Sequence, residues 1–189
     1  IKVGHAGTLD PLASGLLIIC TGKQTKEIHT YQGQIKEYTG KFTIGSTTPS
    51  YDLETDVDKT YPIDHITEEL LLETTKQFVG EIQQKPPIFS AIKKDGKRLY
   101  ELARKGETTE IKSRTVTISE FEITKINLPE VEFRVVCSKG TYIRSLAYDF
   151  GLALNSGAHF SSLRRTKIGD FSVDNGLSVD SFIESLKVV

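Results

Sequence analysis

Residues 115–137 read TVTISEFEITKINLPEVEFRVVC, with apolar and polar residues alternating on both sides of a central Leu-Pro-Glu. Such alternation, with its period of two residues, predicts strands that bury one face. The short break contains a proline, which favours a turn. We therefore expect residues 115–127 and 131–137 to pair as antiparallel strands.

The segments on either side of this hairpin switch between strand and helix periods. Strands are expected at residues 35–44 and 160–171, and helices with apolar faces turned inward at residues 67–79, 97–105, 141–154 and 179–186. Residues 12–21 are expected to begin as a helix and to continue as a strand. No regular strand–helix–strand repeat and no glycine-rich phosphate loop occurs. The sequence therefore predicts an α+β fold, with a mixed, mostly antiparallel sheet flanked by helices.

The chain length of 189 residues allows one large domain with a sizeable core. Its 38% hydrophobic and 26% charged residues are typical of a globular protein. No apolar run approaches the roughly 18 residues that cross a bilayer, and no secretory signal opens the chain. These features predict a cytoplasmic protein without membrane association. The absence of methionine leads us to expect that an N-terminal segment is missing from the sequence.

The net charge of −1 conceals a strong pattern along the chain. Residues 51–75 are rich in acids, whereas residues 85–115 and 139–169 are rich in lysine and arginine. Two basic segments on a nearly neutral chain favour a localised phosphate-binding face, and solvated helix surfaces are the alternative. Cys20 and Cys137 lie in apolar stretches and are expected to be buried thiols. No cysteine–histidine cluster has the spacing of a metal site.

One aspartate, Asp10, lies in the glycine-rich stretch GHAGTLDPLASG of residues 4–15. Pro11 disfavours the α region for the residue before it, so Asp10 is expected in extended or turn geometry. A loop of this kind can present a carboxylate to a large ligand, as a nucleophile, a base or a metal ligand. The alternative is an aspartate that caps the segment after it.

The stretch GHAGTLDPLASGLL of residues 4–17 resembles the catalytic loop of the TruB family of tRNA pseudouridine synthases. Residues 84–93, QKPPIFSAIK, resemble the middle block of that family, and residues 137–146, CSKGTYIRSL, resemble its second active-site block. A weaker match covers residues 162–171. The blocks occur in the family's order and span most of the chain. The resemblance implies the pseudouridine synthase fold.

The resemblance also assigns three catalytic residues. Asp10 matches the family's nucleophile, and Arg144 is nominated as the cation that keeps this carboxylate ionised. Tyr38 resembles the tyrosine that stacks on the target base and can act as an acid–base group. Tyr142 would wall the pocket, and Leu163 would pack on the other side of the uracil. Without the resemblance, each of these residues could be an ordinary surface or core residue.

Further assignments concern binding and gating. His5 matches a histidine that fills the gap left by the flipped nucleotide. Asp52 could correspond to an aspartate that pairs with the active-site arginine in the empty enzyme, although the residues around it depart from the family pattern. Possible phosphate contacts are Lys36, Lys93, Arg104 and Arg164.

The function implied is isomerisation of a uridine to pseudouridine in the T-loop of tRNA, at position 55, by base flipping and an aspartate nucleophile. No cofactor and no metal are expected. The implied partner is the T-arm of tRNA, with no obligatory protein partner, and the protein is expected to be a monomer. Residues 1–175 would form the catalytic domain and residues 176–189 a short C-terminal helix, the remnant of a C-terminal extension. Alternatives are an RNA-binding or tRNA-folding module and a guide-RNA-dependent synthase subunit.

Overall fold

The computed structural model describes residues 1–90, 93–94, 97–99 and 111–187. Its centre is a seven-stranded sheet in the order β13-β12-β4-β11-β10-β7, with β2 paired to β12 beside this path. The strands are β2 Ala13–Gly15, β4 Lys36–Ile44, β7 Gly80–Gln84, β10 Arg114–Asn127, β11 Glu130–Cys137, β12 Ala158–Ile168 and β13 Phe171–Ser172. Only the β2–β12 pair is parallel. The predicted mostly antiparallel α+β fold is therefore confirmed.

The hairpin predicted from the alternating stretch is the β10–β11 pair. It opens from Asn127 opposite Glu130 and runs to Ile118 opposite Cys137, with two register shifts. Alternate residues of β11 are buried, as the period of two requires. The other edge of β11 pairs with β4, so the hairpin lies inside the sheet.

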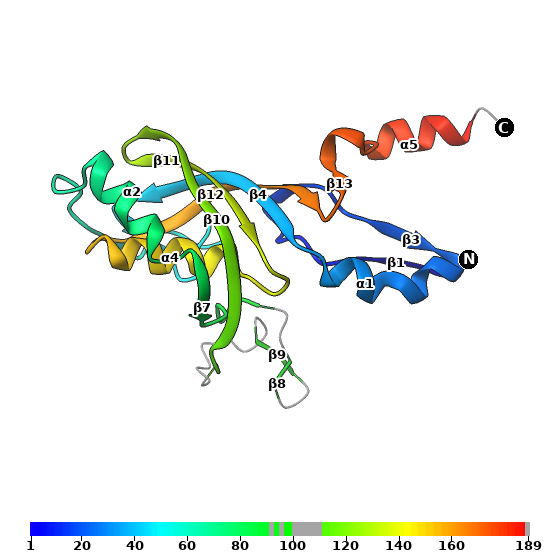
Figure 1. Ribbon diagram of the computed structural model, residues 1–189, viewed down its shortest axis with the longest axis horizontal. Helices are drawn as coiled ribbons and strands as arrows, with labels where there is room; N and C mark the ends of the chain where they lie inside the picture. Colours follow the sequence, from blue (N-terminus) through cyan, green and yellow to red (C-terminus); the bar gives the residue numbers. More distant parts are fainter. Residues whose placement is uncertain (91–92, 95–96, 100–110, 188–189) are drawn as a thin grey trace.

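Two helices cover one face of the sheet, α2 (Glu68–Lys76) and α4 (Ile143–Ala153) (Figure 1). Thr67 caps α2 by accepting a hydrogen bond from the Leu70 amide. Under the helices Phe42 stacks on Phe133 with ring centroids 4.0 Å apart, and Phe150 of α4 lies against both Phe42 and Phe121. This aromatic cluster is the centre of the core.

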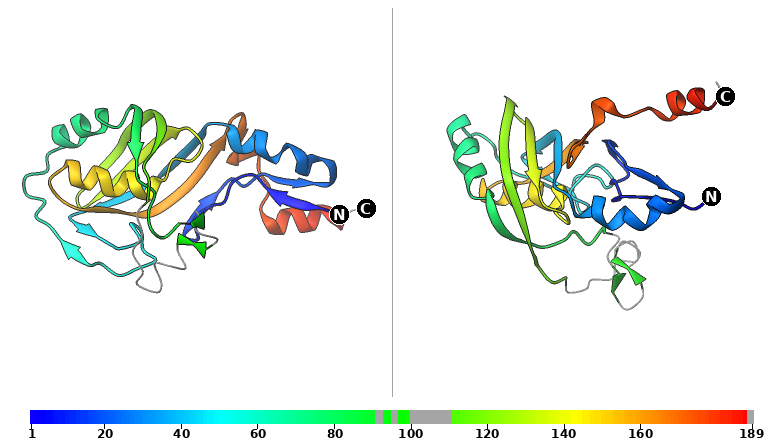
Figure 2. Two further views of the ribbon diagram at one scale, coloured as in Figure 1. Left: turned by 90° about the horizontal axis from the view of Figure 1, so that it is seen from below. Right: turned by 45° about the vertical axis from the view of Figure 1, so that its right-hand side comes forward.

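The remaining elements are short. The short strands are β1 Val3–His5, β3 Ile19–Thr21, β5 Ser46–Thr47, β6 Lys59–Thr60, β8 Lys93–Lys94 and β9 Lys97–Arg98. The helical elements are η1 Gly22–Glu27, α1 Ile28–Gly33, η2 Val173–Asn175 and α5 Val179–Leu186. Both termini lie at the end of the molecule remote from α2 and α4 (Figures 1 and 2). Among the described residues, none of the helices has the length and apolar character that crossing a bilayer demands.

Three local predictions differ from the structure. Residues 12–21 contain no helical start; they form β2 and β3, because β12 and β1 supply the backbone partners. Lys97–Arg98 form β9, and residues 100–105 of the expected helix lie outside the described residues. The last helix is present and capped by Ser178, but none of its residues is buried. Phe182 keeps 53% of its surface exposed, so the expected inward apolar face is wrong.

The loop that contains Asp10 is joined to the sheet at Gly15. Gly15 has φ +106, and its position faces the Arg165 backbone so closely that a Cβ would lie 2.2 Å from the Arg165 oxygen. Next to it, the Leu16 amide donates to that same oxygen at 2.8 Å. Only glycine satisfies both the backbone conformation and this close approach.

We predict that Gly15→Ala lowers the free energy of unfolding by more than about 2 kcal/mol, since it adds a backbone clash to an unfavourable φ. Urea denaturation followed by circular dichroism measures the change. Gly22→Ala is the matched control, because Gly22 also has a positive φ of 56 but nothing within 4 Å of an added Cβ. Equal losses in the two variants would show that the close approach to β12 is unimportant.

Candidate active site

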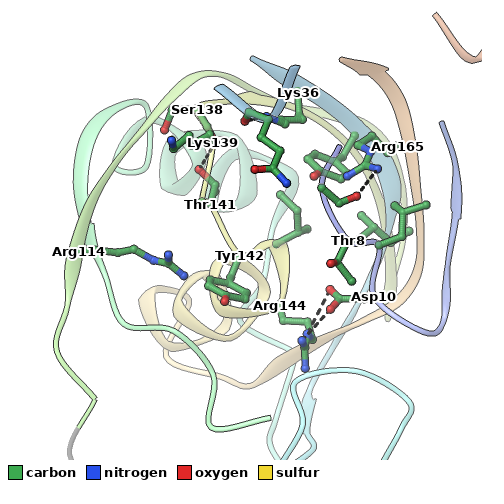
Figure 3. A pocket seen from close by; sticks show the side chains of 17 residues that line it. Thr8, Asp10, Lys36, Arg114, Ser138, Lys139, Thr141, Tyr142, Arg144 and Arg165 are labelled. Atoms are coloured by element: carbon green, nitrogen blue, oxygen red, sulfur yellow. Dashed lines mark hydrogen bonds and ion pairs between the residues drawn. The ribbon is translucent and has the colours of Figure 1, made fainter. Parts of the chain in front are cut away.

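A pocket of about 390 Å³ opens where α4 stops covering the sheet. The core residues Phe42 and Ile44 lie near one end of β4, and Tyr38 and Lys36, on the same strand face, line the pocket at the other end. Leu163 and Arg165 of β12 line it beside them. The Asp10 loop and the first residues of α4 close the sides (Figure 3).

Asp10 and Arg144 meet across this pocket as a two-point ion pair. Arg144 Nη2 donates to Asp10 Oδ1 at 2.7 Å, and Nε donates to Oδ2 at 3.3 Å. Nη1 donates to the Phe89 carbonyl at 2.7 Å, which fixes the plane of the guanidinium. The Arg144 side chain is 4% exposed, whereas that of Asp10 is 25% exposed. The carboxylate is therefore held by its cation yet open to the pocket, as the predicted pairing requires.

A second carboxylate, Asp52, lies on the other side of Arg144. Its Oδ2 is 3.8 Å from Arg144 Nε and has no hydrogen-bond partner, and its side chain is 1% exposed. Oδ1 accepts a hydrogen bond from the Glu54 amide at 2.9 Å. The one guanidinium thus compensates a pocket carboxylate and a buried one. The resemblance implied that Asp52 corresponds to an aspartate that can pair with this arginine, and Asp52 lies within ion-pair distance of it.

The turn that carries Asp52 is held rigidly. Tyr51 has φ 65, an unusual conformation for an aromatic residue, and its ring stacks on Tyr148 of α4 with centroids 4.2 Å apart. The Phe160 amide donates to the Tyr51 carbonyl at 3.1 Å, and Thr48 Oγ1 donates to the Asp52 carbonyl. These contacts fix the distance between the buried carboxylate and Arg144.

Tyr38 lies at the floor of the pocket, paired in register with Arg165 of β12. Burial raises the pKa of the Tyr38 phenol above its ordinary value of 10.0. The hydroxyl therefore keeps its proton at neutral pH and offers both a donor and an acceptor to the pocket. Leu163, near it on β12, provides an apolar surface.

Tyr142 forms another wall of the pocket and is held by Gln84. The Gln84 side chain accepts from the Tyr142 amide at 2.8 Å and donates to the Tyr142 carbonyl at 3.0 Å. Gln84 is fully buried at the end of β7, in the middle block of the sequence. Sequence reasoning did not identify Gln84 as a support of the site.

The lining is strongly basic, and Asp10 is its single acid among the described residues. The cationic lining residues are Lys36, Arg114, Lys139, Arg144 and Arg165. Burial, followed by the charge of Arg165, lowers the pKa of Lys36, whose ammonium donates to the Gln32 and Gln34 carbonyls. Such a pocket suits an anionic substrate such as RNA.

Arg165 was missed by the sequence analysis, which selected Arg164 instead. Arg165 Nε donates to the Leu16 carbonyl at 2.8 Å, and Nη2 donates to the Gly7 carbonyl at 3.1 Å, so it clamps both ends of the Asp10 loop. Arg164 is exposed and lines a second hollow, with Thr39 and Lys41, on the opposite face of the sheet. The alternation of β12 would have revealed this, because Leu163 and Arg165 share a face.

The other predicted residues are placed as follows. His5 ends β1 with an exposed side chain and does not line the pocket. Lys93 lies in β8, and its side chain and the whole of Arg104 are outside the described residues. Cys20 and Cys137 are buried thiols, as predicted. Within the described part of the chain, no group of three or more potential ligands could hold a metal ion.

Two sequence models of known families match the chain. Residues 1–143 match the TruB family pseudouridylate synthase (N terminal domain), and residues 144–187 match the tRNA pseudouridylate synthase B C-terminal domain. The boundary falls at the start of α4, directly before Arg144. The pocket is therefore lined by residues of both matched segments.

Curated relatives are similar over nearly the whole chain. The chain is 70% identical over 186 residues to tRNA pseudouridine synthase B of Flavobacterium johnsoniae, covering 98% of this chain and 81% of that protein. It is 59% identical to the protein of the same name from Phocaeicola vulgatus, covering 98% of this chain and 79% of the relative.

Solved structures with the same fold include a Cbf5-Nop10-Gar1 complex, matched with a TM-score of 0.68 at 33% identity. Another is an H/ACA RNP bound to a substrate RNA containing 2′-deoxyuridine, with a TM-score of 0.64 at 30% identity. Each match covers 91% of this chain but only 42% and 40% of the respective solved chains.

We predict that Arg144→Met destabilises the fold by about 3–5 kcal/mol, because it leaves the buried Asp52 carboxylate without a cation. A second change, Asp52→Asn, should restore part of the lost free energy, since it removes that charge. Urea denaturation at neutral pH compares both variants with Asp52→Asn alone. A double variant no more stable than Arg144→Met would contradict the compensation of Asp52 by Arg144.

Asp149 of α4 provides a pH-dependent test of the region behind the site. Burial raises the pKa of its carboxyl from 3.8 to about 6. The folded state therefore binds this proton more tightly than the unfolded state, and stability falls as the pH rises from about 4 through 6. We predict that Asp149→Asn is more stable than the parent at pH 7 by about 1 kcal/mol, with the difference vanishing below pH 4. Thermal unfolding across this range, with the exposed Asp56→Asn as control, measures it; a pH-independent difference would refute it.

Proposed function

The chain belongs to the TruB family of pseudouridine synthases, and we propose that its pocket converts one uridine of the tRNA T-loop, at position 55, to pseudouridine. The observation that carries this proposal is the Asp10–Arg144 ion pair, at 2.7 Å, in a basic pocket with an aromatic floor. The names of the curated relatives support tRNA as the substrate.

The reaction has defined chemical requirements. The N1–C1′ bond breaks, the uracil turns, and a C5–C1′ bond forms. The proton on C5 leaves, and N1 gains a proton. No electrons are gained or lost, so the pocket has to supply a nucleophile, a holder for the free base and a route for protons. The target base has to leave its stack to reach these groups.

Asp10 acts as the nucleophile in this proposal. Its two oxygens accept hydrogen bonds from Arg144, which orient the carboxylate, while a quarter of the side chain remains exposed to the pocket. Attack at C6 of the uracil and assistance at C1′ are both compatible with this position. Arg144 also orients the carboxylate through the plane that the Phe89 carbonyl fixes.

Tyr38 and Leu163 hold the uracil in this proposal. A flat aromatic ring binds a base through dispersion and π contact, worth about 1–3 kcal/mol per base. The Tyr38 hydroxyl keeps its proton because burial raises its pKa. It can therefore pass this proton toward N1 of the uracil as its oxygen accepts the proton that leaves C5. Tyr142 encloses the base from the side.

Asp52 is a gate in this proposal. Arg144 Nε lies 3.3 Å from Asp10 and 3.8 Å from Asp52, so a small rotation exchanges its carboxylate partner.

Residues 1–175 form the catalytic domain, since the sheet is complete at Ser172 and no residue of the helix beyond it is buried. The protein acts in the cytoplasm as a monomer, without a protein partner and without a guide RNA. His5 fills the gap left by the flipped nucleotide.

We predict that Asp10→Asn lowers the rate of pseudouridine formation at least about a thousandfold while RNA binding persists, because the nucleophile is lost and the cations remain. Tritium release from C5-labelled uridine in a T-arm stem-loop measures the rate, with the full-length protein and nothing else added. Asp56→Asn is the control for removal of an exposed carboxylate.

The same experiment separates the alternatives. Persistent tritium release in Asp10→Asn would refute the role of Asp10. A protein that binds and refolds tRNA but releases no tritium would favour the RNA-binding module. Release that requires an added guide RNA would favour the guide-dependent subunit.

A further inference from the structure

Arg114, at the start of β10, lines the pocket and has two buried side-chain nitrogens without hydrogen-bond partners. Its Nε and Nη2 are shielded from solvent, and neither has a hydrogen-bond partner. No acidic side chain among the described residues forms an ion pair with it. A buried donor left unpaired costs free energy, more so when it belongs to a charged group.

The two unpaired nitrogens of Arg114, Nε and Nη2, correspond to the two with which Arg144 binds its carboxylate. Arg144 binds the Asp10 carboxylate with its Nε and Nη2, a side-on fork that matches two oxygens of one anion. In Arg114 this fork is vacant. The pocket therefore contains two arginines with this donor pair. In Arg144 the pair binds a carboxylate of the protein, and in Arg114 it binds none.

The Arg114 guanidinium lies against Tyr142, and its backbone pairs with the strand that supports Tyr142. Its Cζ lies 4.4 Å from the centre of the Tyr142 ring, so the cation stacks on the pocket wall. Gly140, with φ +85, leaves space beside it, since a Cβ there would lie 3.4 Å from Nη1. Arg114 is also paired in register with Gln84, which holds the Tyr142 backbone. In Figure 3 the guanidinium points from β10 toward Tyr142 and the pocket.

We propose that Arg114 binds a phosphate group of the RNA, one of the two that flank the uridine in the pocket, with Tyr142 as its platform. The proposal rests on the proposed function for the identity of the substrate. A phosphodiester supplies the two anionic oxygens that the fork matches, and it reaches them by a small turn of the guanidinium away from its shielded position. Lys139, on the same pocket wall, adds to the attraction for phosphate.

The test measures binding of a T-arm stem-loop RNA to the full-length protein over a series of salt concentrations. Arg114→Gln should weaken binding about tenfold to a hundredfold, as expected for loss of hydrogen bonds to a charged group. The slope of log affinity against log salt should become shallower by about one phosphate contact. Lys125→Gln removes a cation at the far end of β10, outside the pocket, and should leave affinity and slope unchanged.

Neutral methylphosphonates at each flanking phosphate locate the contact. At one of the two positions the neutral group should weaken binding to the wild type but have little further effect on Arg114→Gln, which is the signature of a direct contact. If Arg114→Gln folds poorly, Arg114→Lys is the second variant. It keeps a cation over the Tyr142 ring but lacks the paired Nε and Nη2 donors. The loss of affinity that the methylphosphonate causes should then be smaller in Arg114→Lys than in the wild type. If Arg114 only supported Tyr142, its substitution would change the rate of pseudouridine formation, but the effect of the methylphosphonate on binding would be the same in the variant and the wild type.

Absence of coupling at both phosphates in both variants, or an unchanged salt slope, would overturn the proposal. Because binding is measured separately from tritium release, the two failures are distinguishable. A wild type that binds RNA with coupling to Arg114 but releases no tritium contradicts the proposed reaction and supports the phosphate contact.

Discussion

The ion pair between Asp10 and Arg144 is the interaction on which the site depends. It joins two residues 134 positions apart, one from a glycine-rich loop and one from the first turn of α4. Arg144 also faces the buried Asp52, so a single guanidinium compensates two carboxylates from separate segments. Each carboxylate limits how far the arginine can move toward the other, so the geometry of the site and the stability of the fold are coupled through one side chain.

The sheet explains why the pocket lies where it does. One face of β4 carries Phe42 and Ile44 beneath the helices and then Tyr38 and Lys36 beyond them. The period of two keeps all four on the same side, so the core continues directly into the pocket floor. The pocket floor thus rests on a strand whose other half is packed, which makes the floor rigid. The clamp of Arg165 on the loop adds the second wall.

The family resemblance and the strand periods predicted much of this arrangement. The hairpin, the strand of residues 35–44 and the helix after Tyr142 all form, and Asp10, Tyr38, Tyr142, Arg144 and Leu163 line one pocket. Arg164 was predicted as a phosphate contact, but the strand period of β12 places Arg165, and not Arg164, on the face of Leu163. Gln84 begins the middle block and Arg114 lies outside every block, and neither revealed its contact with Tyr142, because that residue is more than twenty positions away.

The sequence by itself determined the fold class and the elements with clear periodicity, because these depend on local spacing and on residue type. The motifs that resemble the family nominated the candidate site residues. Only the tertiary structure decided that residues 13–15 are a strand beside β12, that Asp52 and Asp10 share Arg144, and that Arg114 presents an unfilled fork. Such outcomes depend on which distant backbone and charged groups meet. Hydrogen bonds and ion pairs between distant segments are set by the packed fold and leave no period in the chain.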